Sequence, residues 1–387
     1  MSAPLAGGVG AYLDNAATTP LRPEALEAML PFLGPEFANP SAAHGPGRRA
    51  RRALDDARDA LGAALGCLAG EIVFTSGGTE ADNLAISGVH ESVGGEIVVS
   101  AVEHPAVLRP AEARGARVAP VDARGVVDLD ALADLLGPGV RLVSVMAANS
   151  EVGVVQPVRE VVALVRERAP AALVHCDAVQ AFAWLDVAGL CAGCDLVSVS
   201  AHKFGGPKGV GALAVRASAS GALAPLIRGG HQERGLRPGT ENVAGIVAAG
   251  VAAALTVEQR EATVARVGAL RDRLVDGLLA AVPGSAEAAP RALRVAGSAH
   301  LGFADLDGEE LAFLLDGAGV CASVGTACAS GARTPSHVLL AMGWSPAAAR
   351  GTVRFSLGWA TRPDEVDHTL AVAPPLVGRL RAASTPA

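Results

Sequence analysis

Residues 196–209 are LVSVSAHKFGGPKG, a short apolar run that leads into small polar residues and a lysine. The run is nearly all apolar, which predicts a β-strand covered by other elements on both faces. Lys203 would then follow the strand at its carboxyl end, the edge where open α/β sheets bind their ligands. An amine at that place would lie in a dry pocket, which favours its neutral form.

Similar apolar runs alternate with longer Ala/Leu/Arg segments of helical period from about Glu71 to Arg216. That alternation predicts an α/β fold with a mostly parallel sheet and crossover helices. The expected strands are Ile72–Phe74, Ile97–Ser100, Arg117–Pro120, Leu142–Val145, Leu173–Cys176 and Leu196–Val199. After Val257 the pattern changes to a charged amphipathic helix, expected over Glu258–Leu279, and then to shorter elements. We therefore expect a large domain of residues 14–253 and a small domain of residues 1–13 and 254–387.

The composition argues against several classes of partner. The 387-residue chain is 50% hydrophobic and has a net charge of −7, so neither a nucleic acid nor a membrane surface is expected to bind it. Its longest uncharged stretch, Asn242–Val257, is shorter than the roughly 20 apolar residues that cross a bilayer and is expected to form a buried helix. No signal-like segment opens the chain, and six irregularly spaced cysteines do not suggest a disulfide framework. A reducing, cytoplasmic location is therefore expected.

The chain has only two lysines, Lys203 and Lys208, whereas arginine is abundant. A lysine that is kept where arginine fills the other basic positions suggests a task that a guanidinium cannot perform. Forming an imine with a carbonyl group is such a task, because it needs an amine that can lose its proton. The alternative is that two surface lysines survive by chance.

Two further segments carry polar residues just after expected strands. In TSGGTE (75–80), the backbone amides of Gly78 and Thr79 could face a phosphate at a helix N-terminus, although such a turn can also merely begin a helix. In HCDAVQ (175–180), Asp177 could pair with a protonated pyridine nitrogen, or it could cap a helix. A glycine turn, a strand-end Asp and a strand-end Lys, in that order, are typical of a pyridoxal-phosphate fold.

Motifs along nearly the whole chain resemble those of the cysteine desulfurases, within the class V aminotransferase-like enzymes. These motifs are YLDNAATTP (12–20), NPS (39–41), TSGGTEADN (75–83), EH (103–104), EVG (151–153), HK (202–203), ERGLRPGT (233–240) and RFSLG (354–358). The resemblance implies a type I pyridoxal-phosphate transferase fold, with a mostly parallel seven-stranded sheet in the large domain and a smaller α+β domain. It also implies a homodimer with both active sites at the subunit interface.

The resemblance assigns roles around pyridoxal 5'-phosphate. Lys203 would form the Schiff base with the cofactor and remove the substrate α-proton, while His104 would stack on the ring and shuttle protons. Asp177 would pair with the ring nitrogen, and Gln180 would lie near the phenolic oxygen. Ser150 stands where the family usually has an asparagine that touches the same oxygen.

The phosphate and the substrate carboxylate have implied ligands of their own. The residues implied to hold the phosphate are Gly78, Thr79, Ser200, His202 and, from the other subunit, Thr240. Asn39 and Arg354 would bind the substrate carboxylate, for which the planar guanidinium of arginine is well suited. His231 is a departure, since the family usually has glycine at its position.

Cys328 lies in SVGTACASG (323–331), among small residues that suit a mobile loop. A buried structural cysteine is the alternative, but a core residue rarely sits among Gly, Thr and Ser. The segment resembles that of the housekeeping donors of sulfur for iron–sulfur clusters and transfer RNA. Such a donor converts L-cysteine to L-alanine, with the sulfur held on Cys328 as a persulfide for a sulfur-acceptor protein, either an iron–sulfur scaffold or a transfer-RNA thiolase. No metal site is expected, although Cys328 could act as a transient iron–sulfur ligand.

Other functions are open at this point: selenocysteine lyase or another class V aminotransferase, or a non-catalytic sulfur carrier or scaffold. Among the remaining cysteines, Cys191 and Cys194 have redox or zinc spacing. Zinc needs two further ligands, however, and no second such pair occurs. We expect these two cysteines to pack between a helix and a strand, and Cys67 to be structural. Cys321, seven residues before Cys328, could accept sulfur, but a core position is expected for it.

Overall fold

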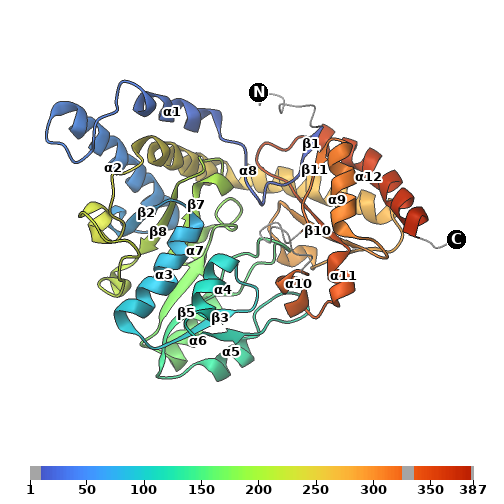
Figure 1. The fold of residues 1–387 in the computed structure, drawn as a ribbon, viewed down its shortest axis with the longest axis horizontal. Helices are drawn as coiled ribbons and strands as arrows, with labels where there is room; N and C mark the ends of the chain where they lie inside the picture. Colours follow the sequence, from blue (N-terminus) through green and yellow to red (C-terminus); the bar gives the residue numbers. More distant parts are fainter. Residues whose placement is uncertain (1–9, 325–334, 385–387) are drawn as a thin grey trace.

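The computed structural model describes residues 10–324 and 335–384. Its larger part is built on a seven-stranded sheet with the order β2-β8-β7-β6-β5-β3-β4 (Figure 1). β8 runs antiparallel to β2 and β7, and the other neighbours are parallel. The strands are β2 (Ile72–Thr75), β3 (Glu96–Ser100), β4 (Arg117–Ala119), β5 (Val140–Ser144), β6 (Leu173–Asp177), β7 (Leu196–Ser200) and β8 (Gly211–Val215). The predicted α/β class and mostly parallel sheet are confirmed.

Helices cover both faces of this sheet. Successive residues of a strand point to opposite faces, so each strand contributes side chains to two hydrophobic cores. On one face Ile97 and Val99 share a core with Leu84 of α3 and Val107 of α4. On the other face Val98 and its neighbours share a core with α2, α6, α7 and the first part of α8. The helices of this part are α1 (Pro23–Leu33), α2 (Gly45–Leu65), α3 (Gly78–Val93), α4 (Pro105–Glu112), α5 (Leu129–Leu135), α6 (Val158–Arg168) and α7 (Val187–Leu190), with 3-10 helices η1 (Ala69–Glu71), η2 (Ala201–Lys203), η3 (Ala217–Ala219) and η4 (Gln232–Gly235).

The smaller part has its own hydrophobic core. An antiparallel sheet of order β12-β10-β9 and a parallel β1-β11 pair lie against α9, α12 and the second part of α8. The elements are β1 (Ala11–Tyr12), β9 (Ser285–Glu287), η5 (Arg291–Leu293), β10 (Ser298–Phe303), α9 (Gly308–Gly317), β11 (Val320–Cys321), α10 (His337–Ala341), α11 (Pro346–Arg350), β12 (Thr352–Ser356) and α12 (Pro363–Ser384). Residues from both ends of the chain thus build this part.

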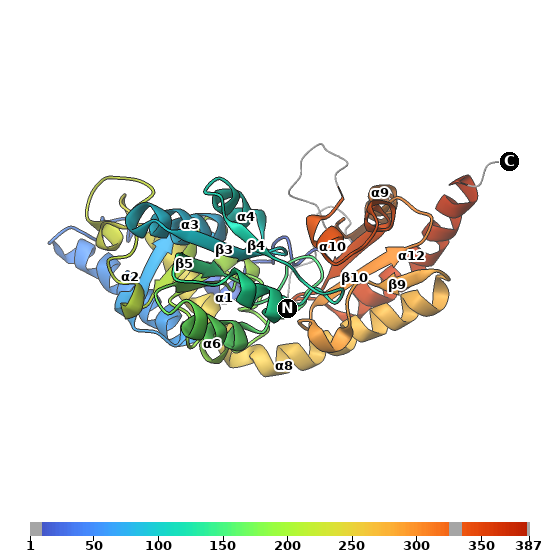
Figure 2. The ribbon, with the colours of Figure 1, turned by 90° about the horizontal axis from the view of Figure 1, so that it is seen from below.

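A single long helix, α8 (Val243–Ala281), runs beneath both parts (Figure 2). The sequence predicted two helices here, one buried and one charged. Residues from Ile246 to Ala253 belong to the core of the large sheet, and residues from Val267 to Leu278 belong to the small core. Neither core covers most of the stretch between them, which explains why the sequence pattern changes there although the helix continues.

By length and composition alone α8 could cross a membrane. Half of its most apolar 18-residue stretch is buried inside the protein, however, and the helix packs against α1 and α2. That burial is the mark of a core helix.

Candidate active site

Lys203 lies in η2, directly after β7, as its position behind an apolar strand predicted. Its Nζ donates hydrogen bonds to the carbonyl oxygens of Ala16 (2.5 Å) and Ala17 (3.0 Å). Gln180 Nε2 donates to the same Ala16 oxygen at 2.8 Å. The amine of Lys203 is therefore held at the wall of a cleft to which both parts of the fold contribute. Residues that line this cleft include Asn15, Ser150, Gln180, Lys203, Ser356 and Trp359.

Asp177 and His104 are both within the electrostatic reach of Lys203. Asp177 ends β6, and burial raises the pKa of its carboxyl to about 6. The hydrogen bond from Val179 N to Asp177 Oδ1 (2.9 Å) and the charge of Lys203 both act to lower that pKa. His104 precedes α4, where its Nδ1 accepts a hydrogen bond from Ala106 N (3.1 Å). Burial lowers the pKa of His104 to about 4, with the charges of Lys203 and His337 acting in the same direction. The imidazole is therefore neutral at pH 7, with its proton on Nε2.

The shifted pKa of His104 is a measurable prediction for the cofactor-free protein. In a proton NMR titration, the imidazole signal that disappears in His104→Gln should stay in its neutral position from pH 8 to pH 6. It should move only as the pH falls towards 4, because burial penalises the imidazolium form. A midpoint near the ordinary value of about 6.5 would show that the ring is solvated, contrary to the structure.

A second group of residues forms a cradle suited to a phosphate at the N-terminus of α3. A Cβ added to Gly78 would lie 2.9 Å from Val179 Cγ2, and one added to Gly211 would lie 2.5 Å from the backbone of Gly77. Glycine at 78 and 211 thus keeps the turn close to β8 and open to a ligand. Ser200 Oγ, near the same turn, is buried and finds no hydrogen-bond partner among the described residues. A phosphate oxygen would supply that partner, and the free amides of the helix end would supply others.

His202 lies beside this cradle. Its Nδ1 is 3.1 Å from Thr18 Oγ1, and its backbone oxygen accepts hydrogen bonds from the amide and the hydroxyl of Thr19. Burial, together with the charges of Lys203 and Lys208, lowers the pKa of His202 to about 4. The ring therefore offers a neutral hydrogen-bonding group at pH 7.

Arg354 comes from β12 of the small part and reaches the loop of residues 149–153. Its Nη2 donates to Asp14 Oδ1 (2.8 Å) and its Nη1 to the carbonyl oxygen of Ser150 (3.0 Å). Asp14 and Ser150 therefore fix the orientation of the guanidinium, while its buried Nε–H is left without an acceptor among the described residues.

Three of the expected ligands lie exposed on the surface of this chain. Asn39 is exposed, and its Oδ1 accepts a hydrogen bond from Ser41 N at 2.8 Å. Thr79 is exposed at the first turn of α3, and Thr240 is exposed before α8. The roles of these residues stay predictions. Cys328 lies outside the described residues, so its place relative to Lys203 is also a prediction.

The sequence did not reveal a buried polar group behind Asp177. His175 Nδ1 is 2.8 Å from Ser144 Oγ, and its Nε2 is 2.9 Å from Ser198 Oγ. Burial lowers the pKa of His175 to about 3 and raises the pKa of Asp82, whose Oδ1 lies 3.6 Å from His175 Nε2. The sequence did hold a signal for this group. Side chains alternate along a strand, so His175 and Asp177 of β6 point to the same face of the sheet.

Asn149 was also missed, although it lines the cleft next to Ser150. Its Nδ2 donates to Val102 O (2.9 Å), and its Oδ1 accepts from Glu151 N (2.8 Å) and Val152 N (2.9 Å). Asn149 thus fixes the loop whose carbonyl group holds Arg354.

Comparison with known proteins identifies the family. The family model described as aminotransferase class-V matches residues 11–369. A cysteine desulfurase of Cereibacter sphaeroides is 48% identical over 382 residues, which cover 96% of this chain and 97% of that protein. An IscS-like cysteine desulfurase of Mycobacterium tuberculosis is 42% identical, over 97% of this chain and 98% of that protein.

Solved structures agree with these relatives. A NifS-like protein superposes with a TM-score of 0.89 at 36% identity, covering 96% of this chain and 100% of its own. SspA in complex with cysteine superposes with a TM-score of 0.77 at 33% identity, covering 91% of this chain and 100% of its own. The chain belongs to the cysteine desulfurase family of class V aminotransferases, which depends on pyridoxal phosphate.

Proposed function

We propose that the chain is a cysteine desulfurase that transfers the sulfur of L-cysteine to Cys328 and releases L-alanine. The observation that carries the proposal is the position of Lys203. One of only two lysines of the chain ends in a cleft between the two parts, and its charge acts on both Asp177 and His104. The relatives named above are themselves cysteine desulfurases, and SspA was solved with cysteine bound.

The residues present fit the cofactor. When bound through Lys203, pyridoxal phosphate supplies an electron sink for negative charge that develops at the substrate α-carbon. Asp177 supports this role because its buried carboxylate needs a cation, and a protonated ring nitrogen is one. The unpartnered hydroxyl of Ser200 and the glycine turn before α3 suit the phosphate.

Lys203 is placed to move a proton, and His104 is placed to donate a hydrogen bond. The carbonyl groups of Ala16 and Ala17 orient the Lys203 amine, which would act as the base towards the α-proton of the substrate. His104 is neutral and uses Nδ1 for the amide of Ala106, so its Nε2–H is left as a hydrogen-bond donor towards a bound group. Arg354, fixed by Asp14 and Ser150, would bind the substrate carboxylate and set the side chain of cysteine in one orientation.

The sulfur leaves as a persulfide in this scheme. The Cys328 thiolate attacks the sulfur of the substrate, a new S–S bond forms, and the bond between Cβ and sulfur breaks. Its electron pair takes up a proton at Cβ, so L-cysteine and one protein thiol become L-alanine and one protein persulfide. No external oxidant is needed.

We further infer a cytoplasmic homodimer that passes the sulfur to an acceptor protein, either an iron–sulfur scaffold or a transfer-RNA thiolase. All five cysteines among the described residues are free thiols, which suits a reducing compartment. Exposed Thr240 and Asn39 suit residues that act at a subunit interface.

Product analysis tests the proposed function. The purified, yellow protein is mixed with L-cysteine without reductant, and alanine and protein-bound sulfane sulfur are measured in the first turnover. We expect one alanine for each persulfide, and mass spectrometry of the digested protein should show the additional sulfur on the peptide that contains Cys328. Alanine without any bound sulfur, or keto-acid formation in its place, would contradict the proposal.

A further inference from the structure

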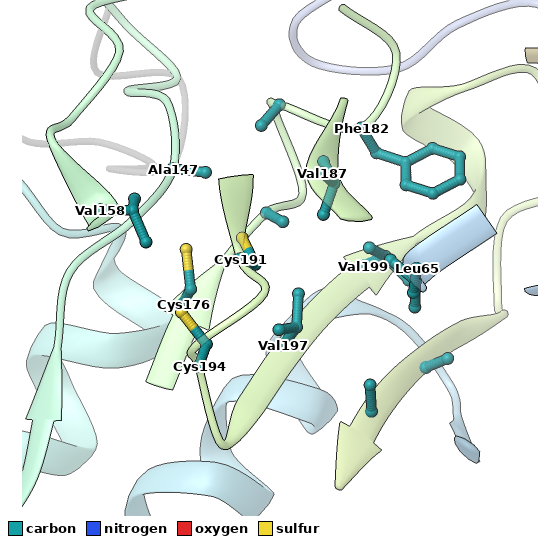
Figure 3. Packing of buried hydrophobic residues seen from close by; sticks show 14 of the residues in the cluster. Leu65, Ala147, Val158, Cys176, Phe182, Val187, Cys191, Cys194, Val197 and Val199 are labelled. Atoms are coloured by element: carbon teal, nitrogen blue, oxygen red, sulfur yellow. The ribbon is translucent and has the colours of Figure 1, made fainter. Parts of the chain in front are cut away.

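Three cysteine thiols converge on the face of β6 opposite Asp177 (Figure 3). Cys191 and Cys194 belong to the turn between α7 and β7, which Cys194 N closes with a hydrogen bond to Cys191 O (3.0 Å). Cys176 comes from β6, and the three sulfur atoms all lie within 4.8 Å of one another. The sequence showed the CAGC pair but not its third member, which only the pairing of β6 with β7 brings beside it.

The surroundings of these sulfur atoms are dry. Cys176 and Cys191 are 0% exposed and Cys194 is 3% exposed. Ala147, Val158, Val187 and Val197 lie around them in the same hydrophobic core (Figure 3). Water therefore has little access to an ion at this place.

The turn that carries two of the thiols is held in place by Arg166. Its Nη2 donates to Gly193 O (3.1 Å) and to Asp195 Oδ2 (2.7 Å), and its Nη1 donates to Ala172 O (2.9 Å). Such outer contacts keep ligands oriented towards a common centre.

The number of ligands selects the kind of ion. Closed zinc sites have four protein ligands, whereas no fourth His, Cys, Asp or Glu joins this group among the described residues. The apolar walls do not favour a water molecule as the fourth ligand. Soft thiolates suit copper(I) as well as zinc, and copper(I) accepts three sulfur ligands without a fourth.

Access to the group is through Cys194. This residue borders a surface hollow that Cys67, Gly66 and Arg216 also line. Cys67 is half-buried there, so a second thiol lies along the route by which a copper ion would arrive.

We propose that Cys176, Cys191 and Cys194 together bind one copper(I) ion through three thiolate sulfurs. Binding forms three Cu–S bonds and releases the protons of the three thiols to solvent, with no change in oxidation state. The site lies on the other face of β6 from Asp177, and the proposal does not rest on the desulfurase reaction.

The test is an anaerobic copper competition on the holoenzyme. Copper(I) is presented as its coloured bicinchoninate complex, and all proteins carry Cys328→Ser so that the thiol of Cys328 does not compete. This protein should withdraw one copper ion per chain from the dye, and a Cys67→Ser version should do the same. The Cys191→Ser/Cys194→Ser version should lose that equivalent. Equal copper uptake with and without the pair would overturn the site.

Two measurements on the protein with an intact site guard against a variant that simply misfolds. X-ray absorption at the copper edge should show three sulfur neighbours and no nitrogen or oxygen neighbour. One equivalent of copper(I) should also raise the melting temperature, because the folded state alone holds the three thiols together. An unchanged melting temperature, or a site filled by zinc with a fourth oxygen or nitrogen ligand, would overturn the copper(I) assignment.

Discussion

Lys203→Ala should reduce alanine formation from L-cysteine by about 10³-fold or more, because the variant loses both the covalent attachment of the cofactor and the base for the α-proton. The remaining contacts, from Ser200, the turn before α3 and Asp177, still bind the cofactor, but without a covalent bond. The purified variant should therefore lose the yellow absorbance that a lysine-bound cofactor gives. Alanine release and visible spectra, measured on the same preparations, check both effects.

Lys208→Ala is the matched control. It removes the only other lysine of the chain, which is exposed five residues further along the same segment. Its colour and rate should stay close to those of the unmodified protein. If Lys203→Ala kept full activity while Lys208→Ala lost it, the assignment of the cofactor lysine would be wrong.

Cys328→Ala should lower desulfuration of L-cysteine by about 10³-fold or more and should leave the protein yellow. The cofactor can still activate the substrate, but no thiolate accepts the sulfur, and removal of one member of a catalytic unit abolishes most of the rate. With L-selenocysteine as substrate, alanine formation should persist, because selenium leaves carbon more readily than sulfur. Assays with the two substrates side by side separate a desulfurase from a selenocysteine lyase.

Cys321→Ala is the control for this second experiment. Cys321 lies on β11, only seven residues before Cys328, and burial raises the pKa of its thiol. A thiol that resists ionisation is a poor nucleophile, so this variant should keep its activity. Unchanged cysteine turnover in Cys328→Ala would mean that sulfur leaves by a route that does not use this residue.

The sequence predicted the large sheet well where its strands are rich in Val and Ile. All six expected strands are present within one or two residues of their predicted ends. The seventh strand, β8, was not located, because GALAV consists mostly of Gly and Ala, which have low strand propensity. It forms nonetheless, since it is buried between β2 and β7 and its glycine lets the turn at Gly77 approach.

The site was predictable where a residue follows a strand, and less so where partners come from distant segments. The positions of Lys203 and Asp177 at strand ends were predicted because both follow apolar runs. Arg354 pairs with Asp14, a residue 340 positions away, and no local sequence pattern predicts this contact. The third thiol, Cys176, was likewise hidden, because only the neighbouring strands bring it to Cys191 and Cys194.

The unbroken course of α8 bears on how substrate enters. Thr256, Arg260 and Thr263 lie at helical spacing on one side of its middle stretch and form part of the cleft wall. One continuous helix has one end in each core, so its length sets the span between the two parts along this wall of the cleft. Entry of an amino acid is then expected to depend on the shape and charge of the residues around the opening rather than on a hinge movement between the two parts.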